Sequence, residues 1–331
     1  MRKKDVALEK KRLQEAQDAI SDILIKEGFR IIKGIKYGPR FLIAEVAKGN
    51  KRGLFKICLF AKSFDPKTNS KLSREILFLE FVNNSEYTSL KKSVPTMYTS
   101  GTNSRSWYIR EYLFGDTQNI NGSNIRFKRS FFNDKNLNWL IKFFSTLQKI
   151  KNRELPPGLR KYLLRSADFN KQIWVFIKPH FKLIEGYLRM PGVSKRFSKI
   201  VKEYIPTYNQ ASRVLSHQEP YPSHLIKNNG QFTLIDWENV NWANPVHDMV
   251  ILWMRAYDHP AWQKKLYFNF KEYYRNYDDF DRLWEIETFI QSCFNIISYY
   301  FHNDTKDLGG LAKFSDRKIK EILEDDFRIH N

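Results

Sequence analysis

The chain has 331 residues, of which 42% are hydrophobic and 15% aromatic, and it carries a formal net charge of +20. This length and apolar content exclude an intrinsically disordered protein and are typical of one large or two ordinary packed domains. The two cysteines, Cys58 and Cys293, lie far apart and outside any C-x-x-C pattern. This excludes a disulfide framework or a cysteine zinc site and indicates a reducing compartment, which we expect to be the cytoplasm.

The positive charge would attract nucleic acid, an anionic metabolite or a lipid headgroup. The chain is also rich in Lys, Asn, Ile, Phe and Tyr together, a composition that an AT-rich genome produces without selection on charge. No Arg-Gly run, RNP-like aromatic motif or zinc-finger spacing occurs. We therefore expect no specific nucleic-acid partner, and leave nonspecific attraction to polyanions open.

Residues 1–28 are charged throughout and contain apolar residues at helical spacing, which predicts an amphipathic helix and not a signal peptide. No uninterrupted apolar run approaches the ~18 residues of a membrane span, so we expect none.

Residues 29–114 are predicted to form a small α+β lobe. Residues 29–62 contain three β-branched and aromatic runs separated by glycines, which predicts three strands. The segment SKLSREILFLEFVNN has helical periodicity, with Ser70 or Ser73 as its expected N-cap. Two further strands are expected around the Gly-Thr-Asn-Ser turn, and short connections favour an antiparallel sheet.

Residues 115–331 are predicted to form a larger, mainly helical lobe. Amphipathic patterns recur at 137–150, 181–204 and 287–301 and in the closing KIKEILEDDF. A short hairpin interrupts them at VLSHQEPYPSHLIKNNGQFTLIDWE, with a polar turn at 217–224 and a strand at 231–238. Acidic residues at the ends of paired strands can take a proton from a hydroxyl and hold a metal on a nucleotide's phosphates.

The hairpin resembles the catalytic loop and metal-binding strand of the aminoglycoside-phosphotransferase-like and choline-kinase-like branch of the protein-kinase fold. The resemblance extends over roughly residues 20–260. It implies that Lys56, in LFKIC, pairs with the nucleotide phosphates and that Glu75, in SREILFLEF, holds this lysine in place. Lys62 is the competing lysine, at the ragged end of the same strand.

The same resemblance implies a nucleotide-covering turn and a segment that reads the adenine base. Gly34 and Gly38 lie where kinase-like folds place the first turn over the phosphates. Glu111 and Leu113 lie in the segment that connects the two lobes, where backbone groups would contact the base.

In the larger lobe the family motif is His-Gly-Asp followed four residues later by Asn, whereas this chain has His217-Gln218-Glu219 and then His224. Glu219 stands in the place of the catalytic aspartate, with one additional methylene. His224 replaces the asparagine that would bind magnesium, and imidazole suits Mn²⁺ better than Mg²⁺. A protonated His224 could instead contact a phosphate directly.

The resemblance also assigns three acidic residues. Asp236, in LIDWE, matches the metal-binding aspartate, and Glu238 is either a second carboxylate near the metal or a solvated loop charge. Asp248 matches the aspartate to which the histidine of the catalytic turn bridges.

The sequence therefore predicts a two-lobed, protein-kinase-like α+β fold that binds ATP and a divalent cation, Mg²⁺ or Mn²⁺. The predicted activity is phosphoryl transfer to the hydroxyl of a small molecule. Residues 152–210 are rich in Arg and Lys, which favours a neutral or anionic acceptor over an aminoglycoside; a solvated helix face is the alternative. A second alternative is a nucleotide-binding pseudokinase that regulates a protein partner, because two motif positions are altered.

Overall fold

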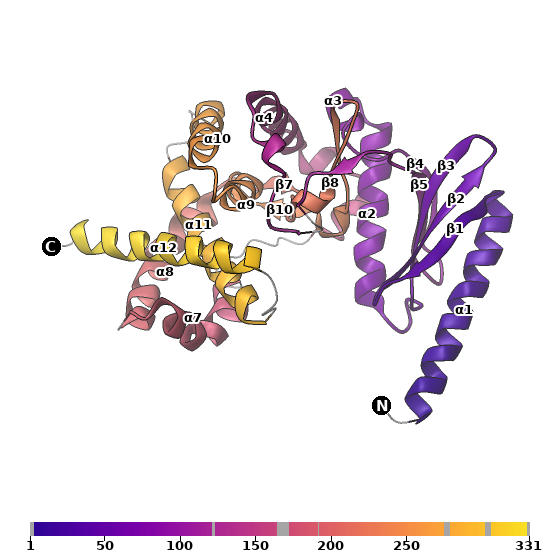
Figure 1. Cartoon of the computed structure of the whole chain (residues 1–331), viewed down its shortest axis with the longest axis horizontal. Coiled ribbons are helices and arrows are strands. Elements are labelled where there is room, and N and C mark those ends of the chain that lie inside the picture. Colours follow the sequence, from indigo (N-terminus) through magenta and orange to yellow (C-terminus); the bar gives the residue numbers. More distant parts are fainter. Residues whose placement is uncertain are drawn as a thin grey trace. The chain divides into compact units, whose positions relative to one another are not determined.

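The structure is a computed structural model, and it describes residues 3–120, 123–163, 172–190, 192–274, 279–301 and 306–329. The chain forms two compact units (Figure 1). The first unit comprises residues 1–116, 152–163 and 226–240. The second comprises residues 117–151, 164–225 and 241–331.

The first unit is built on an antiparallel sheet with the strand order β1-β2-β3-β5-β4. The strands are Arg30–Tyr37 (β1), Phe41–Lys48 (β2), Lys51–Cys58 (β3), Met97–Gly101 (β4) and Trp107–Glu111 (β5). The predicted α+β class, with a small antiparallel sheet unit and a larger helical unit, is confirmed.

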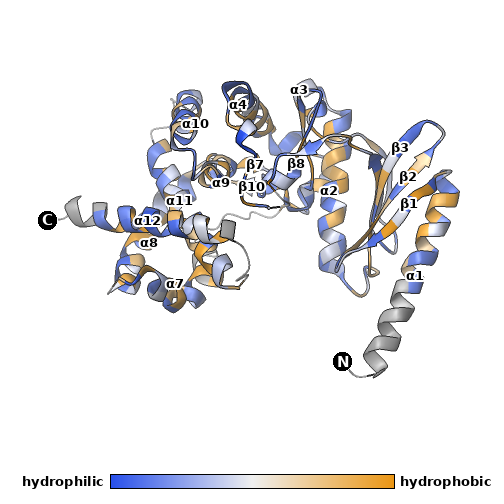
Figure 2. Ribbon diagram, in the orientation of Figure 1, coloured by the Kyte–Doolittle hydropathy of each residue, from blue (hydrophilic) through white to orange (hydrophobic). Residues whose placement is uncertain are grey.

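Two helices cover opposite faces of this sheet, α1 (Lys3–Glu27) and α2 (Pro66–Asn84) (Figure 1). Successive residues of a strand point to opposite faces, so alternate residues of β3 meet different helices. Phe55 packs in one apolar cluster with Ile20 of α1, and Cys58 packs in another with Ile76 of α2. Figure 2 shows apolar residues both on α2 and on the strands of this sheet.

Helix α2 begins earlier than the sequence pattern suggested. Its N-cap is Asp65, whose side chain accepts a hydrogen bond from the backbone N–H of Thr68 at 3.0 Å. Pro66 occupies the first helical turn, where its missing N–H is not needed. The prediction that Ser70 or Ser73 caps the helix was therefore wrong, because an aspartate–proline pair starts the helix one turn earlier.

The first unit also contains the hairpin of β8 (Leu225–Asn228) and β9 (Gln231–Leu234). Asn229 and Gly230 both have positive φ, 48° and 79°, as a two-residue hairpin turn requires. The short helices of this unit are α3 (Thr88–Lys91), η2 (Asn152–Glu154), α5 (Pro157–Arg160) and η6 (Trp237–Asn239). Strand β6 (Asp116–Thr117) follows where the chain passes from the first unit to the second.

The second unit is mainly helical and contains one small sheet. Its longer helices are α4 (Asp134–Gln148), α7 (Phe181–Leu188), α8 (Val193–Gln210), α9 (His247–Arg255), α10 (Pro260–Tyr273), α11 (Phe280–Phe301) and α12 (Lys306–Ile329). Strand β10 (Asn241–Ala243) pairs antiparallel with β7 (Val214–Ser216). The short helices are η1 (Arg129–Phe131), the π-helical η3 (Gln172–Ile177), η4 (Lys178–His180) and η5 (Pro222–His224).

The predicted amphipathic stretch at 181–204 forms two helices. Helix α7 ends at Arg189 in the left-handed conformation, with φ of 52°, and α8 begins after Gly192, with φ of 71°. Their apolar faces pack with α11 in one buried cluster that includes Phe197 and Phe289. Among the described residues, no helix combines the length and apolar character needed to cross a membrane.

Candidate functional site

The centre of the first unit is a buried ion pair between Lys56 on β3 and Glu75 on α2. The Nζ of Lys56 lies 3.0 Å from Oε2 of Glu75, and the two residues are only 6% and 2% exposed. Burial by itself lowers the pKa of Lys56, but the carboxylates around it, led by Glu75, raise this pKa well above its usual value. Lys56 is therefore a fixed positive charge at the end of a rigid strand.

Asp236 is the second carboxylate at Lys56. Its Oδ1 lies 3.3 Å from Nζ, and about a third of its side chain is exposed. The residue follows β9 in the left-handed conformation, with φ of 66° and ψ of 60°, which is unfavourable for a residue other than glycine. Such strained residues concentrate at functional sites.

Trp237 holds this strained segment against α2. Its ring stacks on Phe78 with centroids 4.3 Å apart, and its backbone N–H donates to Oε1 of Glu75 at 3.3 Å. Its indole N–H donates to the carbonyl of Leu234 at 2.8 Å. Trp237 was not predicted as a site residue; its position between two acidic residues is the sequence signal that could have identified it.

Glu238 is buried, contrary to the alternative that it is a solvated loop charge. Its Oε1 lies 3.0 Å from Arg40 and 3.8 Å from Lys71, and its Oε2 lies 3.8 Å from Lys56. Oε2 has no hydrogen-bond donor among the described residues. Arg40 and Lys71 were missed by sequence reasoning because neither stands at a motif position.

Three cations and three carboxylates therefore meet in the first unit. The cations are Lys56, Lys71 and Arg40, and the carboxylates are Glu75, Asp236 and Glu238. Removing the charges of Lys56, Glu75 and Glu238 from water is costly unless each is paired. Burial raises the pKa of Glu75, and its carboxylate helps to raise the pKa of Lys56; buried pairs perturbed in this way are typical of functional sites.

The predicted nucleotide-covering turn differs in the structure. Gly34 lies inside β1, at an irregularity of the β1–β2 pairing, and only Gly38 lies at the turn before β2. The prediction that Gly34 is part of the turn was wrong. Strand β1 continues past this glycine to Tyr37, with an irregularity in its pairing to β2. At Gly38 a side chain would approach the carbonyl of Phe41, with a Cβ at 3.2 Å.

Glu111 ends β5, and its carbonyl accepts a hydrogen bond from Nη1 of Arg110 at 2.9 Å. Its carboxylate accepts from the backbone N–H of Thr96 at 2.9 Å. Glu111, Leu113 and Thr96 line a cavity of about 300 Å³ in the first unit, together with Ile226 of the β8–β9 hairpin.

In the second unit, Asp248 shapes the turn that follows β7. Its carboxylate accepts hydrogen bonds at 2.9 Å from the hydroxyl of Ser216 and from the backbone N–H groups of His217 and Gln218. Burial raises the pKa of Asp248, and these hydrogen bonds oppose the rise. Gln218 has φ of 75°, a conformation that suits the glycine of the family motif.

Glu219 and His224 lie in this same turn. The Nδ1 of His224 lies 2.9 Å from the backbone carbonyl of Glu219, and the backbone N–H of Glu219 is 3.3 Å from Nδ1 of His217. A neutral His224 that donates through Nδ1 presents Nε2 as a lone-pair donor. The Glu219 carboxylate is half-buried, and no described residue forms a hydrogen bond or ion pair with it.

The site residues thus form two groups, each within its own unit. Lys56, Glu75, Asp236 and Glu238 meet in the first unit, whereas Glu219 and His224 belong to the second. No cluster of three or more His, Cys, Asp or Glu with metal-binding geometry occurs among the described residues.

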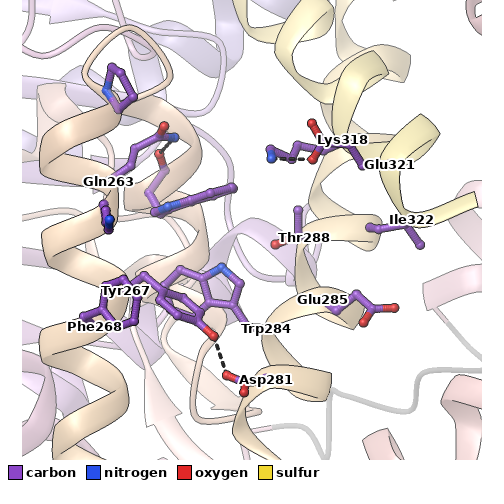
Figure 3. A pocket seen from close by; sticks show the side chains of 13 residues that line it. Gln263, Tyr267, Phe268, Asp281, Trp284, Glu285, Thr288, Lys318, Glu321 and Ile322 are labelled. Carbon is purple, nitrogen blue, oxygen red and sulfur yellow. Dashed lines mark hydrogen bonds and ion pairs between the residues drawn. The ribbon is translucent and has the colours of Figure 1, made fainter. Parts of the chain in front are cut away.

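The second unit contains a separate cavity of about 400 Å³ between α10, α11 and α12 (Figure 3). Trp253, Tyr267 and Trp284 contribute aromatic rings to its wall. The Thr288 hydroxyl is buried without a hydrogen-bond partner among the described residues. The charged side chains of the wall include Lys318 and Glu321, which pair with each other. Trp253 is in the last turn of α9, whereas Asp248 is in the first, so the cavity and the Glu219 turn are at opposite ends of this helix.

Comparison with known proteins supports a phosphotransferase-like chain. Residues 129–284 match the family described as the phosphotransferase enzyme family, which confirms the resemblance predicted from the sequence. No curated protein matches this sequence significantly.

Solved structures of aminoglycoside phosphotransferases share the fold. The GDP complex of wild-type aminoglycoside 2'-phosphotransferase-IIIa superposes with a TM-score of 0.63 at 14% identity, covering 93% of this chain and 99% of that chain. A thermostable mutant of aminoglycoside phosphotransferase APH(4)-Ia, in a ternary complex with ADP and hygromycin B, gives a TM-score of 0.55 at 11% identity, covering 92% and 97%. At these identities the likeness establishes the kinase-like fold and not the substrate.

Proposed function

We propose that the protein is an ATP-dependent phosphotransferase that acts on the hydroxyl of a small molecule. The observation that carries the proposal is the buried Lys56–Glu75 pair, with Asp236 on the same ammonium group. A lysine held in one orientation by a buried carboxylate is suited to bind phosphate oxygens, because its charge is in place before the ligand arrives. The match to the phosphotransferase family and the fold of nucleotide-bound structures support this reading.

The carboxylates fit a divalent cation. Oε2 of Glu238 is buried without a hydrogen-bond donor among the described residues, and Asp236 is partly exposed, so two hard oxygen donors are available in the first unit. One or two carboxylates completed by phosphate oxygens are the usual protein ligands of Mg²⁺ in such sites. A bound cation would neutralise charge on the phosphates. His224 is a further proposed metal ligand, and its imidazole would favour Mn²⁺.

Glu219 is the proposed group that orients or deprotonates the acceptor hydroxyl. Its carboxylate makes no hydrogen bond with a described residue. Asp248 holds the turn by accepting two backbone N–H hydrogen bonds and one from the Ser216 hydroxyl. The extra methylene relative to aspartate displaces the carboxylate by about one bond length. A misplacement on the order of 1 Å can reduce the rate ~10²-fold.

The acceptor is proposed to be neutral or anionic. Within residues 152–210, residues 164–171 and 191 lie outside the described part of the chain. Among the others, Arg153 and Arg160 belong to the first unit and Lys195 and Arg196 to the second. Lys195 is exposed and Arg196 half-buried on α8, so these two positions are accessible for a charge-reversal test.

A nucleotide-binding pseudokinase with a protein partner is the second candidate function. It is favoured by Gln218, which occupies a left-handed position that suits glycine, together with the altered residues Glu219 and His224. The decisive measurement is ADP release from ATP by purified protein with Mg²⁺ and Mn²⁺ separately, beside Asp236→Ala. Slow turnover that disappears in Asp236→Ala supports the enzyme. If turnover equals that of Asp236→Ala and ATP does not raise the melting temperature, the enzyme proposal is wrong.

A further inference from the structure

Glu238 is a buried carboxylate that forms ion pairs with two cations, both of which are more exposed to solvent than it is. The side chains of Arg40 and Lys71 are 48% and 25% exposed, whereas that of Glu238 is 4% exposed. Arg40 lies directly after Gly38-Pro39, and Lys71 is one helical turn before Glu75 on α2. Both cations therefore converge from separate elements on the oxygen Oε1.

Arg40 and Lys56 both lie near the ring of Phe41. The guanidinium of Arg40 lies 5.2 Å from the centroid of the Phe41 ring, and Nζ of Lys56 lies 4.5 Å from the same centroid. Lys56 itself lies 3.8 Å from Oε2 of Glu238. Arg40, Lys56 and Lys71 thus surround one carboxylate, an arrangement that phosphate oxygens can also satisfy.

We propose that Arg40 and Lys71 form a polyphosphate-binding pair whose counter-ion is Glu238 until phosphate and a divalent cation bind. This inference rests on the proposed function. A carboxylate that ligates a divalent cation loses most of its attraction for neighbouring positive groups, because the ion carries the larger charge. If Glu238 held a divalent cation, Arg40 and Lys71 would lose their counter-ion, and phosphate oxygens beside Lys56 would replace it.

The exchange makes an unusual prediction for Glu238→Gln. Removal of the carboxylate charge frees both cations, so this variant binds polyphosphate more tightly than the wild type when no divalent cation is present. Arg40→Gln and Lys71→Gln weaken binding whether or not metal is present.

The test uses the full chain with a fluorescent ATP analogue and, separately, with sodium tripolyphosphate, which has no base. Dissociation constants are measured in EDTA and in Mg²⁺ for the wild type and for Arg40→Gln, Lys71→Gln and Glu238→Gln. Arg30→Gln and Lys48→Gln are matched controls, since each removes one exposed positive charge from the same unit. Lys56→Met tests the proposed function independently. Circular dichroism establishes that each variant is folded.

We expect Arg40→Gln and Lys71→Gln to raise the dissociation constant about tenfold in both EDTA and Mg²⁺, since each loses a charge-assisted contact. The control variants should raise it by less than about twofold. Glu238→Gln should bind tripolyphosphate in EDTA several-fold more tightly than the wild type. Equal affinities of Arg40→Gln and Arg30→Gln, or weaker binding by Glu238→Gln in EDTA, would overturn the inference. If nucleotide binding still depends on Lys56, the proposed function survives that result. Absence of binding to both probes in the wild type would remove both proposals.

Discussion

Trp237 stacks on Phe78 with ring centroids 4.3 Å apart, and this contact joins the segment after β9 to helix α2. The residues on either side of Trp237 are Asp236 and Glu238, the two carboxylates proposed to hold the divalent cation. The same tryptophan donates its backbone N–H to Glu75. A single fully buried ring thus places acidic residues of two distant segments around Lys56.

We expect Trp237→Ala to lower the free energy of unfolding by about 3–5 kcal/mol, because it removes a fully buried ring and leaves a cavity. Trp237→Phe should cost less, since it keeps most of the stacking surface. Urea unfolding measures both values. Trp139→Ala, on the half-buried face of α4, is the control. An equal loss in Trp237→Ala and the control would contradict the anchoring role of Trp237.

The Glu219 turn offers a test between the enzyme and the pseudokinase. If its residues are adapted for turnover, Glu219→Asp combined with His224→Asn should lower kcat, by up to ~10²-fold for a carboxylate displaced by about 1 Å. In a decayed site the same double substitution should raise turnover sharply. ADP release in Mg²⁺ and Mn²⁺ distinguishes the two outcomes. Loss of an initial Mn²⁺ preference in His224→Asn would further implicate the imidazole as a ligand.

Gln218 supplies a prediction about backbone strain. Its φ of 75° lies in the left-handed region, which is unfavourable for residues that have a Cβ. The region is still less favourable for β-branched residues. We expect Gln218→Gly to change the free energy of unfolding by less than about 1 kcal/mol, because the gain in backbone freedom offsets the lost hydrogen bond to Ser216. Gln218→Val should cost more than about 1 kcal/mol. Thermal unfolding provides the comparison, and equal melting temperatures of the two variants would refute the argument.

The buried His247–Glu287 pair predicts a pH-dependent stability. Burial by itself lowers the pKa of His247, but Glu287, whose Oε1 is 2.7 Å away, raises the pKa above its ordinary value of 6.5. Burial tends to raise the pKa of Glu287, and His247 lowers it below 4.5. The histidine's contribution is therefore complete below pH 6.5 and disappears as the pH rises through its folded-state pKa. The carboxylate's contribution is present above pH 4.5 and disappears as the pH falls.

We accordingly expect His247→Gln to lose most stability relative to the wild type between about pH 5 and 6, and less at alkaline pH. Each unit by which the His247 pKa is raised corresponds to about 1.4 kcal/mol. The measurement is urea unfolding at pH 5.5 and pH 8.5. If the variant and the wild type differ in free energy of unfolding by the same amount at pH 5.5 and at pH 8.5, the pair does not titrate as described.

The charge of the acceptor can be tested on α8. Lys195→Glu together with Arg196→Glu reverses two charges at accessible positions. If the acceptor is anionic, its KM should rise by about tenfold while the KM for ATP is unchanged, since only acceptor attraction is altered. Lys264→Glu and Lys265→Glu, on α10 of the same unit, form the control. An acceptor KM equal to that of the control would exclude an anionic pocket at α8.

Much of the site could be predicted because local sequence determines strands, helices and turns. The apolar run before Lys56 and the periodicity around Glu75 placed these residues on a strand and a helix, where β3 and α2 now hold them. The irregular β1 around Gly34 was not predictable, because a bulge depends on the pairing of β1 with β2. The cap Asp65 lies several residues before the first residue of the apolar periodicity, so the periodicity does not predict it.

The sequence by itself determined the fold class, the order of the motifs and the altered residues Glu219 and His224. Only the tertiary structure decided that Arg40 and Lys71 converge on Glu238 and that Trp237 secures both neighbouring carboxylates to α2. The physical reason is the range of the interactions. Strands, helices and turns follow from residues a few positions apart, whereas these charges and rings come from segments more than 150 residues apart and meet only when the sheet and α2 pack around them.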